Sequence, residues 1–175
     1  MNESSLVLVL DGHDGSGKTT LARRLAESLG GAHAQPYSGI VGQQLFCLIE
    51  RHNFQEANRL AQQAVNRAIA NADSPVVICD RHWMTAFSIL PETYWSGWEW
   101  LPPTTLCWTD LETTISRLED RLDQDAQQYD HGHFLSIYWE LGQRFRSHVL
   151  RTDTLTLDES FAQLFSWATH FVGQT

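Results

Sequence analysis

The stretch at residues 11–20 constrains this chain more than any other part of the sequence. It reads Asp-Gly-His-Asp-Gly-Ser-Gly-Lys-Thr-Thr and directly follows an apolar run at residues 6–10. Glycines let a loop fold so that its backbone N–H groups face a phosphate, and a helix that starts next adds its positive end. In such a P-loop, Lys18 reaches the β- and γ-phosphates of a nucleotide and Thr19 binds Mg²⁺. The sequence therefore predicts a strand, a phosphate-binding loop and a helix, with ATP held by Gly12, Asp14, Gly15, Ser16, Gly17, Lys18, Thr19 and Thr20.

Length and charge narrow the fold and the partners of the chain. Its 175 residues, of which 42% are hydrophobic, suffice for one buried core, so we expect a single domain over residues 1–175. The net charge of −9 leaves no broad basic face, which disfavours duplex nucleic acid as a partner. There is no basic leader and no apolar run of membrane-spanning length, so we expect no membrane partner and a cytoplasmic location. We expect the cysteines, Cys47, Cys79 and Cys107, to be free thiols.

Hydrophobic periodicity predicts strands that alternate with helices. In the first half, we expect helices at 18–29, 41–51 and 56–70, a short strand at 32–35 and a β-branched strand at 76–79. In the second half, the pattern predicts a helix and a packed aromatic loop within 83–108, strands at 105–108 and 154–157, and helices at 111–125, 134–150 and 160–172, the last capped by Ser160. This order predicts an α/β fold with a doubly wound parallel β-sheet flanked by helices.

The strand at 76–79 delivers Asp80 and Arg81 to its carboxyl end. In an open parallel sheet this edge is where ligands bind, so both side chains are expected beside the P-loop. Asp11, at the start of the loop, is expected to cap or buttress it. Arg117 and Arg121 lie one turn apart on the predicted helix at 111–125. They either take part in catalysis or lie on a solvated face of the helix, and the sequence favours neither alternative.

Several separated stretches together resemble the thymidylate kinase branch of the nucleoside monophosphate kinases. The loop at 11–20 is similar to that family's P-loop, including the acidic Asp14, and residues 77–81 resemble its Asp-Arg motif. The Asn-Arg pair at 58–59 is similar to a helix whose arginine contacts the thymine base, and residues 129–134 resemble the segment that closes the lid. The likeness covers most of the chain and implies a single-domain P-loop kinase with a short lid at about residues 117–132.

The resemblance implies a role for each matching residue. Asp14 would read the 3′-hydroxyl of the acceptor sugar, Arg59 would contact the base, and Arg81 would bind the acceptor phosphate. Phe54, one residue off the family spacing, would stack on the base, and Tyr129 belongs to the closing segment. Thr19 and Asp80 would hold Mg²⁺. The implied catalytic residues are Lys18, Asp14, Asp80, Arg81, Arg121 and Arg117; the implied cofactors are ATP and Mg²⁺; and the family also implies a homodimer.

Two arginines of the family pattern are missing. Gly15 and Ser16 in the loop and residues 122–128 in the lid contain no arginine, which leaves Arg117 and Arg121 as candidates. Residues 35–38, Gln-Pro-Tyr-Ser, also lack the phosphate-binding arginine that the family places after its second strand. A kinase must neutralise phosphates on both of its substrates. The chain therefore has fewer positively charged side chains to bind the acceptor phosphate than the family implies.

Three functions are consistent with these residues. The leading one is ATP- and Mg²⁺-dependent transfer of a phosphoryl group to a deoxypyrimidine nucleoside monophosphate. The alternative is a deoxynucleoside kinase, which accepts a neutral hydroxyl and can do without the missing arginine, although such enzymes place a glutamate base where this chain has Gln35. A nucleotide-binding protein with degenerate kinase activity is the third. A kinase that acts on a base within DNA is disfavoured by the acidic composition.

Overall fold

The computed structural model describes residues 5–120 and 129–173. Within these residues, a five-stranded parallel sheet has the strand order β2-β3-β1-β4-β5. The strands are β1 (Leu6–Asp11), β2 (Ala32–Ala34), β3 (Val76–Asp80), β4 (Thr104–Trp108) and β5 (His148–Arg151). The helices are α1 (Lys18–Leu29), α2 (Ile40–Glu50), α3 (Phe54–Asn71), α4 (Trp83–Ile89), the 3₁₀ helix η1 (Glu92–Gly97), α5 (Leu111–Glu119), α6 (His131–Arg144) and α7 (Leu157–Val172). The predicted α/β class with a parallel sheet flanked by helices is confirmed.

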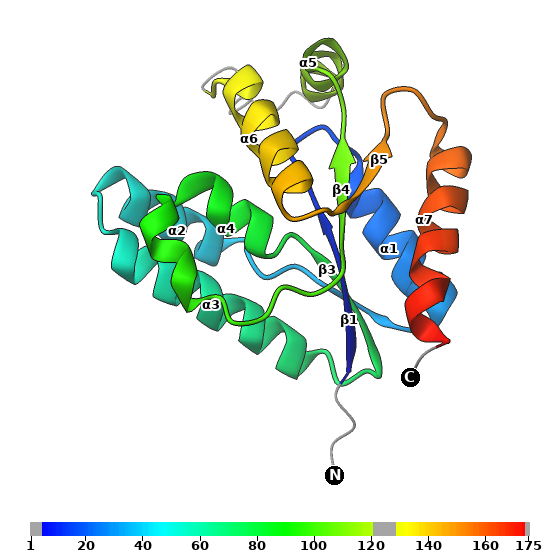
Figure 1. The fold of residues 1–175 in the computed structure, drawn as a ribbon, viewed down its shortest axis with the longest axis horizontal. Helices are drawn as coiled ribbons and strands as arrows, with labels where there is room; N and C mark the ends of the chain where they lie inside the picture. The colour runs from blue at the N-terminus through cyan, green and yellow to red at the C-terminus, as the bar shows by residue number, and fades with distance from the viewer. Residues whose placement is uncertain (1–4, 121–128, 174–175) are drawn as a thin grey trace.

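Helices cover both faces of the sheet (Figure 1). On one face, α1 and α7 pack against β1 through a core that includes Leu8, Leu10, Leu25 and Leu164. On the other face, α2, α3, α4 and α6 enclose a second core around Trp83. Because the central strands are covered on both sides, they need apolar side chains at every position. This requirement explains the unbroken apolar runs in β1 and β3.

The strand order places the P-loop and the Asp-Arg pair side by side. β1 lies between β3 and β4, and its Leu10 is in register with Asp80 at the end of β3. The N–H of Arg81 extends the ladder by donating to the carbonyl of Leu10 at 2.9 Å. The loops after β1 and β3 therefore leave the sheet at the same edge. This edge is where open parallel sheets bind their ligands.

The carboxyl-terminal third of the fold differs from the sequence prediction. α6 ends at Arg144, not at residue 150, and the strand that follows is His148–Arg151, not 154–157. The helix stops because Arg146 takes a left-handed conformation, with φ 51°. The N–H of Ser147 then donates to the carbonyl of Gly142 at 2.9 Å, as in a Schellman motif. Glycine usually occupies that left-handed position. Because the chain has an arginine there, the sequence contains no signal that the helix ends.

The start of α7 was also predicted wrongly. Its cap is Thr156, whose hydroxyl accepts from the N–H of Glu159 while the Glu159 carboxylate accepts from the N–H of Thr156. This reciprocal pair is a capping box, and its Thr-x-x-Glu signature is present in the sequence. Ser160 lies inside the helix and is buried. The helix therefore begins three residues before the predicted position.

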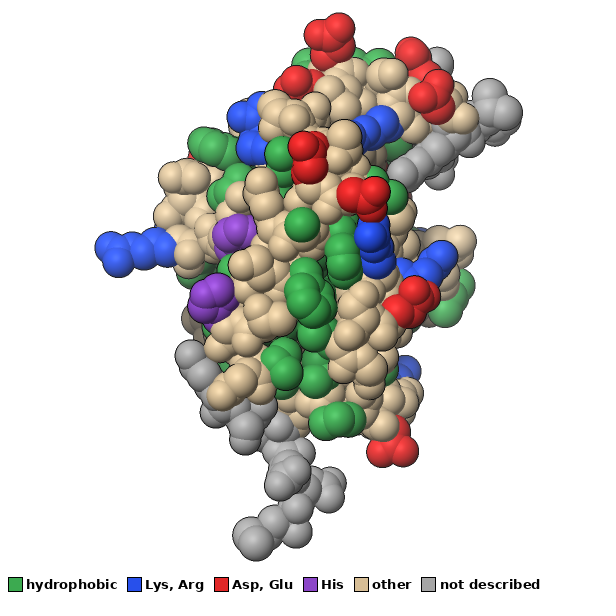
Figure 2. Space-filling view, turned by 90° about the vertical axis from the view of Figure 1, so that its right-hand side faces the viewer, with side chains coloured by type: hydrophobic (Ala, Val, Ile, Leu, Met, Phe, Trp, Pro, Cys, Tyr) green, Lys and Arg blue, Asp and Glu red, His purple; other side chains and the backbone are tan. Residues whose placement is uncertain are grey.

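The face of the molecule that carries α1 and α7 is shown in Figure 2. Hydrophobic side chains gather there in a band, with scattered charged side chains of both signs around it. Phe161, Phe165 and Trp167 of α7 are partly buried and pack on the core beneath. Among the residues that the structure describes, no helix is long and apolar enough to cross a membrane.

Candidate active site

The P-loop takes a shape that its glycines make possible. Gly12 has φ 146°, and a Cβ built there would lie 2.2 Å from the carbonyl oxygen of Cys107, so only glycine fits between β1 and β4. Gly17 has φ 76° and forms the N-cap of α1, which begins at Lys18. Left-handed backbone of this kind is costly for residues with a Cβ. The loop therefore delivers the start of α1, with its partial positive charge, to the edge of the sheet.

Lys18 is the only lysine in the chain. Its side chain is 6% exposed, and its Nζ donates to the carbonyl of His13 at 3.2 Å and lies 3.6 Å from the Asp14 carboxylate. Burial and the nearby Arg81 lower the pKa of Lys18, while Asp14 opposes that shift. The loop thus holds its ammonium group in place before any phosphate arrives.

Asp80 and Thr19 form a pair suited to a divalent cation. Burial alone would raise the pKa of Asp80, but its contacts with His33, Lys18 and Thr19 lower it to about 2. Its Oδ2 accepts from the amide of Gln35 at 3.0 Å, whereas its buried Oδ1 has no hydrogen-bond partner among the described residues. An ionised carboxylate oxygen left without a partner beside a P-loop threonine is the donor set that Mg²⁺ prefers. These two residues therefore fit the predicted magnesium site.

Arg81 joins the P-loop to two helices. Its Nη1 donates to the carbonyl of Gly12, to Thr85 on α4 and to the hydroxyl of Tyr138 on α6, each at 3.2 Å. Its Nη2 forms an ion pair with Asp14. Burial would raise the pKa of Asp14, but Arg81 and Lys18 hold it well below its usual range. The Arg81 guanidinium and the Asp14 carboxylate therefore lie together beside the P-loop and are paired with each other.

Asp11 buttresses this arrangement from below, as predicted. Its buried carboxylate accepts from the N–H of His82 at 2.9 Å and from the N–H and hydroxyl of Thr85 at 3.2 and 2.6 Å. Burial raises the pKa of Asp11, and the hydrogen bond from Thr85 and the charge of Arg81 oppose that rise. A carboxylate at the start of α4 also suits the positive end of that helix. Asp11 thus fixes α4, and with it Thr85, relative to the P-loop.

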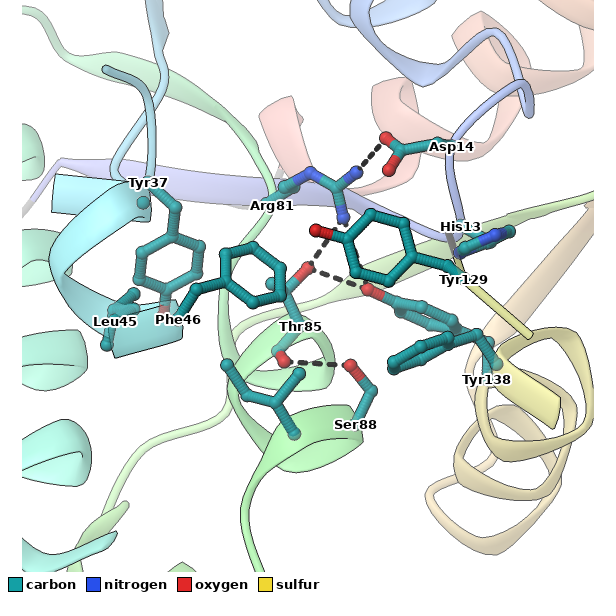
Figure 3. Close-up of a pocket in the computed structure, with 13 residues that line it drawn as sticks. His13, Asp14, Tyr37, Leu45, Phe46, Arg81, Thr85, Ser88, Tyr129 and Tyr138 are labelled. Carbon is teal, nitrogen blue, oxygen red and sulfur yellow. Dashed lines mark hydrogen bonds and ion pairs between the residues drawn. The ribbon is translucent and has the colours of Figure 1, made fainter. Parts of the chain in front are cut away.

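A cavity opens beside Arg81 and Asp14 (Figure 3). The P-loop, α2, α4 and α6 all contribute to its walls. Its mouth is crossed by Phe46 of α2 and Tyr129, whose ring centroids lie 6.0 Å apart. The lining residues are His13, Asp14, Tyr37, Gly42, Leu45, Phe46, Arg81, Thr85, Ser88, Ile89, Tyr129, Phe134 and Tyr138. We call this the acceptor cavity.

The structure places two predicted base-binding residues away from the acceptor cavity. Phe54 packs against Tyr94 with ring centroids 5.7 Å apart and belongs to the core on the α3 side of the sheet. Arg59 is exposed and forms an ion pair with Glu56, one turn away on the same helix. Neither residue is among the lining residues of the cavity, so their contacts with a base remain a prediction of the resemblance. Trp95 and Trp98, which follow Tyr94, pack on the same core, in line with the packed aromatic loop expected within residues 83–108.

Several cavity residues had no role in the sequence analysis. Thr85 and Ser88 follow Arg81 by four and seven residues, so α4 presents them on the face that begins with the Asp-Arg pair. That helical spacing could have identified them. Tyr138 and Phe46 gave no comparable signal, because they come from helices far away in the sequence. Burial raises the pKa of Tyr138 to about 12, so its hydroxyl stays neutral beside Arg81.

A second cavity lies on the other side of the loop. It is lined by Gly15, Gly17, Thr20, Leu21, Arg117, Thr152, Leu155, Leu157 and Ser160. The hydroxyl of Thr152, just after β5, donates to the carbonyl of Ser16 at 2.9 Å. The P-loop therefore separates two cavities. We call the second one the donor cavity.

Arg117 does not extend freely over the loop. Its Nη1 donates to the carbonyl of Gly15 at 3.1 Å, and its Nη2 donates to the carbonyl of Thr152 at 2.7 Å. The guanidinium thus joins α5, the P-loop and the chain after β5. Arg121, the other candidate, lies outside the described residues.

Replacing Arg117 with alanine should raise the KM for ATP by about tenfold and change kcat less. The reason is that the lost charge-assisted bonds hold the walls of the donor cavity and are the same before and during transfer. Steady-state kinetics over a range of ATP concentrations measures both constants, and Arg67→Ala on the exposed face of α3 is the control. An equal fall in kcat at constant KM would instead place Arg117 on the transferred phosphoryl group.

His13 joins the P-loop to the start of α6. Its Nε2 lies 2.7 Å from Nδ1 of His131, and its ring stacks on Phe134 with centroids 5.6 Å apart. Burial lowers the pKa of His13 to about 4, although Asp14 opposes the shift. The ring is therefore neutral at physiological pH. It contributes packing to the site and no positive charge.

Lowering the pH from 6.5 to 4.5 should destabilise the protein through His13. The unfolded chain binds a proton at this residue below its ordinary pKa of 6.5, whereas the folded chain does so only near 4. Stability contributed by neutral His13 is therefore present above pH 6.5 and is lost as the pH falls, up to about 2 kcal/mol at pH 4.5. Urea unfolding at both pH values should show a smaller loss in His13→Phe, which keeps the ring stacking. Equal losses in the two proteins would contradict the assignment.

Comparison with known proteins supports the fold. No protein-family model matches the chain, and no curated protein sequence matches it. The structure of deoxyadenosine kinase from M. mycoides with bound dCTP matches with a TM-score of 0.65 and 12% identity, covering 94% of this chain and 99% of that one. The same kinase with the products dCMP and a flexible dCDP gives a TM-score of 0.63, and with dATP 0.59, each at 13% identity and with 99% of that chain covered. They cover 94% and 93% of this chain, respectively.

These neighbours share the fold of this chain but do not single out the thymidylate kinase branch expected from the sequence. They are deoxyadenosine kinases, so the likeness does not support a thymidylate kinase in particular. At 12–13% identity, these matches support a shared fold but neither a shared activity nor a shared substrate. This chain has the same fold as these structures, an α/β domain with a parallel sheet and a P-loop.

Proposed function

We propose that the protein transfers the γ-phosphoryl group of ATP to the 5′-hydroxyl of a deoxynucleoside. The observation that carries the proposal is the position of the P-loop between two cavities, with Lys18 and the Arg81–Asp14 pair beside it. The donor cavity would hold ATP and the acceptor cavity the nucleoside. In the reaction, the bond from the γ-phosphorus to the bridging oxygen of ADP breaks, and a bond to the 5′-oxygen forms.

Positioning and charge neutralisation would supply the catalysis. Lys18 and the amide groups of the loop would neutralise the transferred phosphoryl group. Asp80 and Thr19 would hold Mg²⁺, which when bound offsets the charge of the donor phosphates. Asp14 is the one carboxylate among the described residues that line the acceptor cavity. Its low pKa suits it to accept a hydrogen bond from a hydroxyl of the sugar, and the proton of the 5′-hydroxyl would pass to an oxygen of the transferred phosphoryl group.

The charges in the acceptor cavity favour a nucleoside over a nucleoside monophosphate. Among the described lining residues, Arg81 is the one permanently cationic side chain, and Asp14 already neutralises it. His13 is neutral there, and Arg59 lies elsewhere. Among the described lining residues, a phosphate dianion would find no positive charge that is not already paired, which is unfavourable. A neutral hydroxyl requires only hydrogen-bond partners.

The deciding experiment offers the purified protein ATP, Mg²⁺ and either the four natural deoxynucleosides or their 5′-monophosphates at equal concentration. We expect at least one nucleoside to be phosphorylated about tenfold faster than its monophosphate, because the monophosphate lacks a charge partner. The Lys18→Ala protein, purified in the same way, controls for contaminating kinases. Faster turnover of a monophosphate would restore the leading function of the sequence analysis. Binding of ATP without any product would favour a degenerate nucleotide-binding protein.

A further inference from the structure

The two ends of the acceptor cavity differ in chemistry (Figure 3). At the P-loop end, Asp14, Arg81, Thr85 and Tyr138 bond to one another. The opposite end is formed around α2, where Leu45 and Phe46 lie with Tyr37 at a distance from His13 and Asp14. Gly42, which also lines the cavity, belongs to the same helix. We call this the apolar end.

Two hydroxyl groups near the apolar end donate to backbone carbonyls of the protein. The hydroxyl of Tyr37 donates to the carbonyl of His82 at 3.0 Å, and the hydroxyl of Ser88 donates to the carbonyl of Thr85 at 2.9 Å. Among the lining residues that the structure describes, none carries a side-chain amide, and Asp14 is at the other end. Side-chain amides and carboxylates, which can pair with the hydrogen-bonding edge of a base at two points, are therefore missing from the described residues of this end.

The side-chain amides on one face of α3 contact the segment around η1. The Asn58 amide donates to the carbonyl of Tyr94 at 2.9 Å, and its oxygen accepts from the indole of Trp98 at 2.7 Å. Gln62 lies against Gly97, close enough that a Cβ there would be 2.8 Å from its amide nitrogen. This face holds the aromatic segment around η1 in place. It does not reach the acceptor cavity.

We infer that the apolar end holds the nucleobase by shape and ring stacking, without reading its hydrogen-bonding edge. The inference rests on the proposed function and names the property of the substrate that the site selects. Phe46 and Tyr129, which approach each other across the mouth, supply aromatic faces for a planar ring. A hydrophobic pocket separates substrates that differ by one methylene by only about 10- to 200-fold, whereas a hydrogen-bonding pocket rejects an unpaired analogue by about 10⁴- to 10⁵-fold. Nucleosides whose bases have the same shape should therefore be phosphorylated with similar kcat/KM.

The test compares thymidine with the deoxyriboside of 2,4-difluorotoluene, which has the outline of thymine but lacks its strong hydrogen-bonding groups. With ATP and Mg²⁺, kcat/KM for the two acceptors should agree within about tenfold, as expected for a site that recognises shape. A larger loss with the isostere overturns the inference. Both acceptors are measured with the full-length chain under identical conditions.

A variant identifies the apolar end as the place where the base lies. Phe46 is 45% exposed, so Phe46→Ala is compatible with the fold, and it should lower kcat/KM for both acceptors about tenfold by removing a stacking face. Ile40→Ala is the matched control, because Ile40 is 65% exposed on the same helix and does not line the cavity. If Phe46→Ala changes neither acceptor, or changes thymidine alone, the inference fails.

Failure of the inference can be separated from failure of the proposed function. If none of the four natural deoxynucleosides is phosphorylated, the proposed function fails. If another deoxynucleoside is phosphorylated but thymidine and its isostere are not, the proposed function stands. In both cases, calorimetric titration of thymidine and the isostere into the protein decides the inference alone. Dissociation constants within about tenfold of each other support shape recognition. A larger difference, or no binding of either compound, overturns it.

Discussion

Replacing Lys18 with alanine should lower the rate of phosphoryl transfer by about 10²- to 10³-fold or more, the range seen when one preorganised electrostatic group is removed from a transition state. The ammonium is already fixed between the His13 carbonyl and Asp14, so the wild-type site needs no rearrangement to use it. The fold should survive, because the core beneath the loop is formed by other residues. Single-turnover rates and circular dichroism on the same preparation test both statements.

The matched control for Lys18→Ala is Arg23→Ala, which removes a positive charge from the exposed side of the same helix. That variant should retain the wild-type rate, since an exposed charge contributes about 0–1 kcal/mol at most. A folded Lys18→Ala protein with a near wild-type rate would remove the P-loop from the mechanism.

Replacing Arg81 with glycine should lower kcat/KM by the equivalent of about 1.5–3 kcal/mol, the range for one hydrogen bond to a charged group, because solvent screens its partly exposed ion pair with Asp14. Glycine is the informative substitution, because Arg81 has φ 78° and glycine adopts that backbone conformation without strain. The variant removes the side chain that joins the P-loop, α4 and α6, and it leaves Asp14 without its main partner. Its thermal unfolding and its kinetics should be measured together.

Two further variants show which property of Arg81 matters. Arg81→Lys keeps the charge but loses the planar fork that reaches several partners at once, so most of the loss should remain. Arg144→Ala breaks an exposed ion pair with Glu92 and should leave kcat/KM unchanged. Full activity in Arg81→Lys would reduce the role of Arg81 to simple charge neutralisation.

The parts of the fold that the sequence predicted well depend on local signals. β1, the P-loop and α1 follow one another within 29 residues, and glycines and apolar runs mark each boundary. β3 and the Asp80–Arg81 pair were predicted equally well, since a buried parallel strand is a continuous apolar run. The meeting of the two loops at one edge then followed from the general behaviour of parallel sheets.

The parts that the sequence did not predict depend on distant contacts. Whether Arg59 faces the site is decided by the rotation of α3, which the bonds of Asn58 to Tyr94 and Trp98 fix from more than thirty residues away. The walls of the acceptor cavity come from α2, α4 and α6, and no local pattern pairs Phe46 with Tyr129. Arg146 in the left-handed region hid the end of α6 because a glycine signal was absent there.

Because Lys18 is the single lysine of the chain, cleavage after lysine can report how often the P-loop opens. A protease that cleaves only after lysine has one site in the whole chain, and that site follows Lys18, whose side chain is 6% exposed in the folded protein. Cleavage therefore requires the loop to open, and under conditions of fast reclosing its rate follows the population of the open form. A nucleotide bound at the loop should slow the cut, so the unmodified chain can reveal by one band on a gel how often its phosphate-binding loop opens.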